Sequence, residues 1–191
     1  MIITLRELLD ILVMIAATGY IFMGIVAQRP RPKDVLARLE HGASFDWRAF
    51  RMSVLVTAPA LIVHELAHKF VAMGFGLQAT FHAAYEWLVI GIALKLLNTG
   101  FIFFIPGYVS LGSSMSPLQS LLIAGAGPLL NLMLWLGTWG LLTYGKWTRQ
   151  QFIVIFMTRK INMWLFILNM LPLPFADGFK VYQGLWRVMG L

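Results

Sequence analysis

Long apolar runs constrain the fold of this chain more than any other feature. The first run, Leu8 to Ala27, has 20 residues and a single charge, Asp10. A helix of that length rises about 30 Å, which matches the hydrocarbon core of a bilayer. A Gln-Arg-Pro-Arg-Pro sequence follows it instead of a small-residue cleavage site. We therefore expect a retained transmembrane helix and not a signal peptide.

Four further apolar runs follow along the chain. Met52 to Gly76 and Pro117 to Tyr144 are each long enough to cross a bilayer. Trp87 to Val109 is interrupted by polar residues, and it fits one helix, a helix with an extended segment, or a re-entrant hairpin. The last run starts at Phe152, is interrupted by Arg159-Lys160, and continues from Ile161 to Val181. We predict it as the final membrane helix, broken near its centre.

The break in the last run has a local cause. Pro172 and Pro174 stand two residues apart, and a helix cannot continue through them. Broken backbone inside a bilayer is tolerated only where it packs against protein or lines a wet cavity. We therefore expect a cavity beside this segment.

The composition agrees with a membrane protein. Hydrophobic residues make up 59% of the 191 residues and charged residues 12%, about half of the ~25% charge of soluble domains. This excludes a disordered chain, a coiled coil and an ordinary soluble enzyme. The net charge is +7, from 15 Lys and Arg against 8 Asp and Glu. Most of the Lys and Arg lie in short loops, as in membrane proteins and not as in a nucleic-acid-binding module.

We predict one membrane-embedded domain over residues 1–191, with an all-α fold of four to six transmembrane helices and room for a short β-hairpin. Residues 1–51 form a first helix and a polar loop in this prediction, and residues 52–191 form the core. Within the polar stretch 28–51, Val35 and Leu39 favour a short amphipathic helix on the membrane surface, and a solvated loop is an equal alternative.

A metal-binding pattern lies inside the second apolar run. His64-Glu65-Leu66-Ala67-His68 has the form HExxH, in which the two histidines share one helix face and can bind one metal ion. Glu65 stands beside them, where it can take a proton from water on the metal. Ionisable groups inside a membrane segment are costly and are usually functional. The chain has no cysteine, which excludes thiolate ligands and disulfides.

Catalytic zinc usually has three protein ligands and one water, so a third ligand must come from outside the motif. The acids after the motif are Glu86 and Asp177, and His82 offers a nitrogen. Asp177 follows the broken segment that must line a cavity. Glu86 and His82 lie at an expected membrane edge, where a solvated side chain is ordinary. We favour Asp177, with Glu86 as the alternative.

These motifs together resemble the site-2 protease family of intramembrane zinc metalloproteases. The matching residues are His64, Glu65, His68, Asn169, Pro172, Asp177 and Gly178. Ala126-Gly127-Pro128, followed by Asn131, resembles the small-residue helix that the family has between the two motifs. The likeness extends from about Leu61 to Gly178. Two departures are Ala176, where the family usually has Leu, and Pro174, three residues before the Asp and not two.

The resemblance implies one zinc ion held by His64, His68 and Asp177, with Glu65 as general base and then acid. It implies a minimal archaeal-type core without an inserted PDZ or CBS domain, in a prokaryotic cell membrane. The substrate would be the transmembrane helix of another protein. Asn169 matches the family position that contacts the substrate backbone or oxyanion, and capping the carbonyls freed at the helix break is an equal alternative.

A helical substrate must unwind before its carbonyls can be attacked, and an edge strand could hold the unwound segment. The stretch Gly107 to Gly112 alternates bulky and small residues and could supply such an edge.

The orientation of the protein in the membrane is open at this point. The family places the zinc end toward the cytosol, which would put loop 28–51 outside, whereas its six Lys and Arg favour the inside.

Two rival functions remain at this point. One is a membrane zinc protease that takes Glu86 as its third ligand. The other is a metal-binding scaffold or transporter without catalysis. A site that only binds metal does not need a general base, so Glu65 argues against the second rival.

Overall fold

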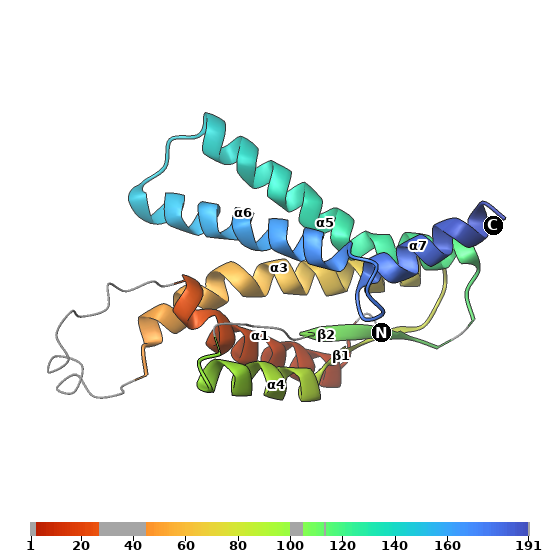
Figure 1. Ribbon diagram of the computed structural model, residues 1–191, viewed down its shortest axis with the longest axis horizontal. Helices are drawn as coiled ribbons and strands as arrows, with labels where there is room; N and C mark the ends of the chain where they lie inside the picture. The colour runs from red at the N-terminus through yellow and green to blue at the C-terminus, as the bar shows by residue number, and fades with distance from the viewer. Residues whose placement is uncertain (1–2, 27–44, 100–104, 113, 191) are drawn as a thin grey trace, which may run out of the picture.

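The computed structural model describes residues 3–26, 45–99, 105–112 and 114–190. These residues form six helices and one two-stranded sheet (Figure 1). The elements are, in chain order, α1 (Leu5–Val26), α3 (Trp47–Gly74), β1 (Ala79–Ala83), α4 (Tyr85–Leu96), β2 (Gly107–Leu111), α5 (Pro117–Tyr144), α6 (Arg149–Asn169) and α7 (Asp177–Val188).

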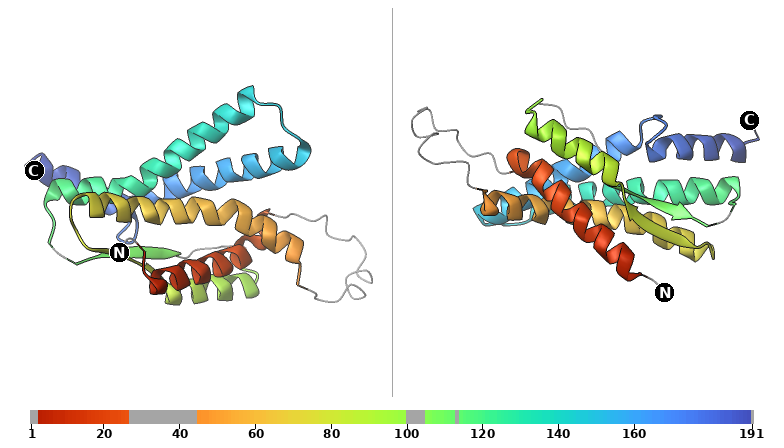
Figure 2. Two further views of the ribbon diagram at one scale, coloured as in Figure 1. Left: turned by 180° about the vertical axis from the view of Figure 1, so that it is seen from behind. Right: turned by 90° about the horizontal axis from the view of Figure 1, so that it is seen from below.

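Four of these helices, α1, α3, α5 and α6, are long and apolar enough to cross a membrane. The predicted all-α fold with four to six spans is confirmed, with four candidate spans in the described residues. Helix α3 lies at the centre. One side of it packs against α1 and the sheet, and the other side packs against α5 and α6 (Figures 1 and 2).

Local capping explains where three of the helices begin. Helix α3 starts at Trp47, before the predicted Met52, because the Asp46 side chain accepts a hydrogen bond from the backbone N–H of Ala49 at 3.0 Å. Capping boxes begin the other two, formed by Ser116 with Gln119 at α5 and by Thr148 with Gln151 at α6. The predicted surface helix around Val35 and Leu39 lies outside the described residues.

The last predicted membrane helix is wrong in its bounds. The run expected from Phe152, with an interruption at Arg159-Lys160 and a continuation to Val181, is instead the unbroken helix α6, which begins at Arg149 and ends at Asn169, and α7 begins separately at Asp177. The charged residues at 159–160 do not end the helix, because their long side chains keep their charges at its surface, and the Lys160 ammonium lies 5.1 Å from the Phe156 ring centroid. The break falls where the two prolines predict it.

The third apolar run is a short helix followed by an extended segment. Helix α4 has 12 residues, about 18 Å, which is too short to span a bilayer. Strand β2 then pairs antiparallel with β1, with Phe81 opposite Val109. Because α4 lies between the two strands in sequence, the sheet is not the predicted hairpin. Gly107 allows the strands to meet, since a Cβ there would lie 2.5 Å from the Phe81 ring.

A buried ion pair joins three elements beside the core cluster of Met14, Leu61 and Phe81. The Lys69 ammonium of α3 binds the Glu7 carboxylate of α1, and each residue is 2% exposed. The same carboxylate accepts a hydrogen bond from the backbone N–H of Phe81 at 2.8 Å. The pair therefore fixes α1 and β1 against the helix that carries HExxH.

Replacing Glu7 with glutamine is expected to lower the free energy of unfolding by about 3–5 kcal/mol, because it leaves the Lys69 charge buried without its counter-ion. The double variant Glu7→Gln/Lys69→Met should recover much of that loss. Chemical denaturation in mild detergent measures both, with the exposed Glu86→Gln as the control. A double variant as unstable as the single one would contradict this account.

Candidate metal centre

Helix α3 and the start of α7 bring three ligand atoms together. The Nε2 atoms of His64 and His68 are 3.1 Å apart. The Oδ2 atom of Asp177 lies 3.1 Å from the first and 3.2 Å from the second. The two histidines are one helical turn apart and buried, and the carboxylate is half-buried. Within the described residues, these three form the group of His, Asp and Glu side chains suited to hold a metal ion.

The broken segment positions the third member of this group. The chain leaves α6 at Asn169, turns through residues 170–176, and starts α7 with Asp177 as its first residue. Gly178 packs against the backbone of Met170, where a Cβ would lie 2.6 Å from the carbonyl carbon and oxygen. This turn therefore requires a glycine at position 178. The N-terminus of α7 also favours a negative charge at Asp177.

Each histidine is oriented by its other ring nitrogen. His68 Nδ1–H donates to the backbone carbonyl of Ile123 at 2.7 Å, and His64 Nδ1 is bonded to Oδ1 of Asn131. A carbonyl oxygen only accepts, so the proton of a neutral His68 ring lies on Nδ1 and its Nε2 presents a lone pair to the site. Bonds of this kind are typical around metal-bound histidines.

The donor set fits zinc. Two imidazole nitrogens and one carboxylate oxygen form a ligand set of catalytic zinc sites, and ligands about 2.0–2.1 Å from a tetrahedral ion stand roughly 3.3 Å apart. The three observed separations are 3.1, 3.1 and 3.2 Å. Three lone-pair atoms this close repel one another unless protons or a metal cation lie among them. The arrangement therefore calls for a positive charge at its centre.

The Asp177 carboxylate is held ionised in this geometry. Burial alone would raise its pKa, but in the metal-free site hydrogen bonds from His64 and His68, whose Nε2 atoms then carry protons, outweigh burial and keep the pKa of Asp177 well below its usual range. An ionised carboxylate is the form that binds a metal, and a divalent cation would take the place of the imidazole protons.

Helix α5 closes one side of the site. Its Gly127 lies directly against the imidazoles, where a Cβ would be 2.3 Å from His68 Nε2 and 2.7 Å from His64 Cε1. A glycine is therefore needed at this point for α5 to approach α3. The sequence showed a small-residue run here, but it did not show that the run contacts the ligands.

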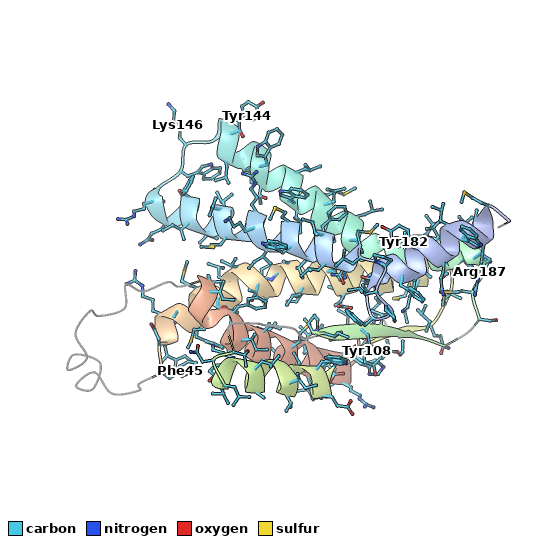
Figure 3. All side chains as sticks on the ribbon, in the orientation of Figure 1. Phe45, Tyr108, Tyr144, Lys146, Tyr182 and Arg187 are labelled. Atoms are coloured by element: carbon cyan, nitrogen blue, oxygen red, sulfur yellow. The ribbon has the colours of Figure 1, made fainter. Side chains whose placement is uncertain are left out.

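Glu65 lies beside the ligands at the edge of a cavity of about 1120 Å³. The cavity lies between the sheet and α4 on one side and α3, α5, α6 and α7 on the other. The residues that line it include Glu65, His68, Tyr108, Val109, Asn169 and Asp177. A cavity therefore lies beside the broken segment, as the two prolines predicted. Figure 3 shows Tyr108 on β2, which runs below the junction of α6 and α7.

The structure separates the other candidate residues from the ligand group. Asn169 lines the cavity at the end of α6, and its side chain makes no hydrogen bond with the described residues. Glu86 lines the cavity from the first turn of α4. His82 lies on β1, where Nε2 is 3.0 Å from the Ser110 hydroxyl and Nδ1 is 3.9 Å from Asp10. Neither Glu86 nor His82 belongs to the metal-binding group.

Comparison with known proteins gives one relative over nearly the full length. A protein of Methanocaldococcus jannaschii, named a "putative zinc metalloprotease", is 30% identical over 190 residues, which cover 97% of this chain and 90% of that protein. No family model matches the chain. No solved structure matches it.

Proposed function

The chain belongs to the zinc metalloprotease family of the Methanocaldococcus relative, and from that membership we propose that it is an intramembrane endopeptidase of the site-2 protease type. It hydrolyses peptide bonds within or beside the transmembrane helices of other membrane proteins. In this proposal His64, His68 and Asp177 bind one zinc ion, and Glu65 is the general base and then the general acid.

The observation that carries the proposal is the position of the ligand group along a membrane-spanning helix. His64 lies ten residues before the end of α3, about 15 Å along its axis, and α3 is apolar and long enough to cross a bilayer. A peptide bond that reaches this site must therefore enter within or close to the hydrocarbon layer. A soluble protease would have no reason to place its site there.

Aromatic and basic side chains at the two ends of the molecule support a membrane location. Tyr144 and Lys146 lie at the α5–α6 connection, and Tyr182 and Arg187 lie on α7 at the other end (Figure 3). Tyr144 is 89% exposed. Tyrosine and basic residues are enriched at both membrane–water interfaces. In this proposal the two groups mark the two interfaces.

The chemistry divides between the metal and the protein side chains. Zinc, when bound, supplies a Lewis acid that activates water and polarises the scissile carbonyl. The Glu65 carboxylate, next to the ligands on the same helix, removes the proton from the attacking water and returns it to the leaving amine. The Asn169 amide faces the cavity without a partner among the described residues, so it is available to donate to the substrate backbone.

Strand β2 offers the substrate an open edge. In the part of the chain that the structure describes, β2 pairs only with β1. Gly112 N–H donates to Gln78 O at 3.0 Å, and Ala84 N–H donates to Pro106 O at 3.3 Å. Because such pairs alternate along an antiparallel ladder, even-numbered residues of β2 face β1. The backbone groups of Gly107, Val109 and Leu111 therefore face away, toward an added strand.

Proline at Val109 is expected to raise the substrate KM several-fold and to change kcat little. It removes one open-edge N–H and leaves every bond to β1 in place. Val109→Ala is the matched control, because it trims the same side chain and keeps the donor. Steady-state cleavage of a transmembrane substrate measures both constants, and equal KM values for the two variants would contradict strand addition.

The ligand assignment is tested by metal content. The purified protein should hold one zinc per chain after dialysis against a weak chelator, and Asp177→Ala should lose most of it because only two ligands remain. Glu86→Ala, an acid in the same cavity, should keep its zinc. Loss of zinc from Glu86→Ala and not from Asp177→Ala would assign the third ligand to Glu86.

The intramembrane activity is tested by mapping cleavage sites. The purified protein is incubated with a panel of single-span membrane proteins, and the products are identified by mass spectrometry. We expect cuts within the hydrophobic segment or a few residues from it, abolished by chelation and restored by zinc. Cuts confined to soluble domains, or to unfolded soluble proteins, would show a zinc protease of a different type.

A further inference from the structure

A chain of hydrogen bonds leads from the metal centre into helix α6. His64 Nδ1 is bonded to Oδ1 of Asn131 on α5. Asn131 Nδ2–H donates to Asn162 Oδ1 on α6 at 2.8 Å, and Asn162 Nδ2–H donates to the backbone carbonyl of Thr158 at 2.9 Å. Both asparagines are 0% exposed. The function assigned above uses neither of them.

The two backbone carbonyls give this chain a fixed direction. The Thr158 carbonyl accepts only, so Asn162 must turn its Nδ2 toward it and its Oδ1 toward Asn131. Asn131 must then donate from Nδ2, which also reaches the Ala60 carbonyl at 3.4 Å. Its Oδ1 is left facing His64, so His64 Nδ1 must be the donor. The lone pair of His64 is therefore on Nε2, the atom beside Asp177.

The two histidines reach the same tautomer by different routes. His68 donates directly to the Ile123 carbonyl, which no side-chain substitution can remove. His64 depends on the side chain at position 131, and that side chain is oriented by Asn162. Two buried amides among apolar helices are costly unless every polar atom is paired, and here each is. The hydrogen bond between the two asparagines is enough to join α5 to α6. A role in joining the helices therefore does not explain the additional bond from Asn131 to His64.

We propose that Asn131 is a positioning residue for His64, fixed in direction by Asn162, and that this pair sets the affinity of the metal site. The inference rests on the proposed function, because it takes His64 as a metal ligand. An acceptor at Nδ1 holds the imidazole in one tautomer and one ring orientation and makes Nε2 a better ligand. Loss of such an outer partner typically weakens metal affinity about 10- to 100-fold.

The test distinguishes the effect of losing the hydrogen-bond acceptor at position 131 from the effect of changing the shape of the side chain. Asn131→Leu has nearly the same shape and offers no acceptor. Asn131→Asp keeps an acceptor for His64 and loses the donor to Asn162. The full-length proteins are purified in detergent, stripped of metal, and titrated with zinc against a competing chelator and with cobalt by absorption spectroscopy. Neither readout requires a substrate.

We expect Asn131→Leu to bind zinc about 10- to 100-fold more weakly than the wild type, with an altered cobalt spectrum. Asn131→Asp should bind within a few-fold of the wild type and restore the spectrum. Asn162→Leu removes only the acceptor that orients Asn131, so its zinc affinity should fall less than that of Asn131→Leu. This variant serves as the test if Asn131→Leu does not fold. Wild-type affinity in all three variants, or equal losses in Leu and Asp at position 131, would overturn the inference.

A purely structural role and a failed ligand assignment give different results. If the asparagines only join the helices, both position-131 variants will lower the unfolding temperature of the metal-free protein and share one zinc affinity. His64→Ala tests the proposed function itself. If His64→Ala keeps wild-type zinc affinity, the ligand assignment is wrong. If it loses zinc and Asn131→Leu does not, only the inference about Asn131 fails.

Discussion

Replacing Glu65 with glutamine is expected to lower kcat for peptide cleavage by about 10²- to 10⁴-fold while one zinc stays bound per chain. Glutamine has nearly the shape of glutamate but cannot take a proton from water, and general base catalysis typically contributes a factor of this size. The residue stands next to the metal-binding group without belonging to it. The metal content should therefore not change.

The matched control for this variant is Glu86→Gln, which alters another acid lining the same cavity. It should retain most of the activity, because Glu86 does not belong to the metal-binding group. Cleavage rates and zinc content are measured on the same preparations. Near wild-type turnover by Glu65→Gln would remove the general base from the mechanism, and loss of zinc from it would make Glu65 a ligand.

A large loss of zinc affinity is also expected when a single methyl group is added at Gly127. Gly127→Ala should weaken zinc binding at least about 100-fold, a loss at the upper end of those caused by disturbing the surroundings of metal ligands. The added Cβ would stand 2.3 Å from His68 Nε2 and 2.7 Å from His64 Cε1. Neither ring can move aside without breaking the Nδ1 hydrogen bond that orients it.

Helix α5 supplies its own control for this substitution. Gly137 lies on the same helix, and a Cβ there would meet no atom within 4 Å. Gly137→Ala should bind zinc as the wild type does and unfold at an equal or higher temperature, because alanine favours a helix over glycine. Zinc titration of both variants is the measurement. Equal affinities in both would show that α5 can withdraw from the ligands.

Part of the metal centre could be predicted from the sequence because it depends on local spacing. His64 and His68 share a face by helical periodicity alone, and Glu65 lies beside them for the same reason. Asp177 was favoured because the prolines before it required a cavity. The structure brings Asp177 to the two histidines, although it is 113 residues from His64.

The parts that sequence reasoning missed depend on contacts between distant segments. Asn131 lies 67 residues from His64 and 31 residues from Asn162, and no periodicity connects them. A buried asparagine in an apolar run was the signal that could have marked it. The pairing of β1 with β2 across α4 is non-local in the same way. The start of α6 could have been predicted from the sequence, because Thr148 and Gln151 have the spacing of a capping box.

The break between α6 and α7 also places the last member of the metal-binding group late in the chain. Two members of the group, His64 and His68, lie in α3, and the third, Asp177, is the first residue of α7. A nascent chain that has inserted everything up to α6 therefore lacks the complete donor set. Metal binding by all three members of the group therefore requires α7 to be in place.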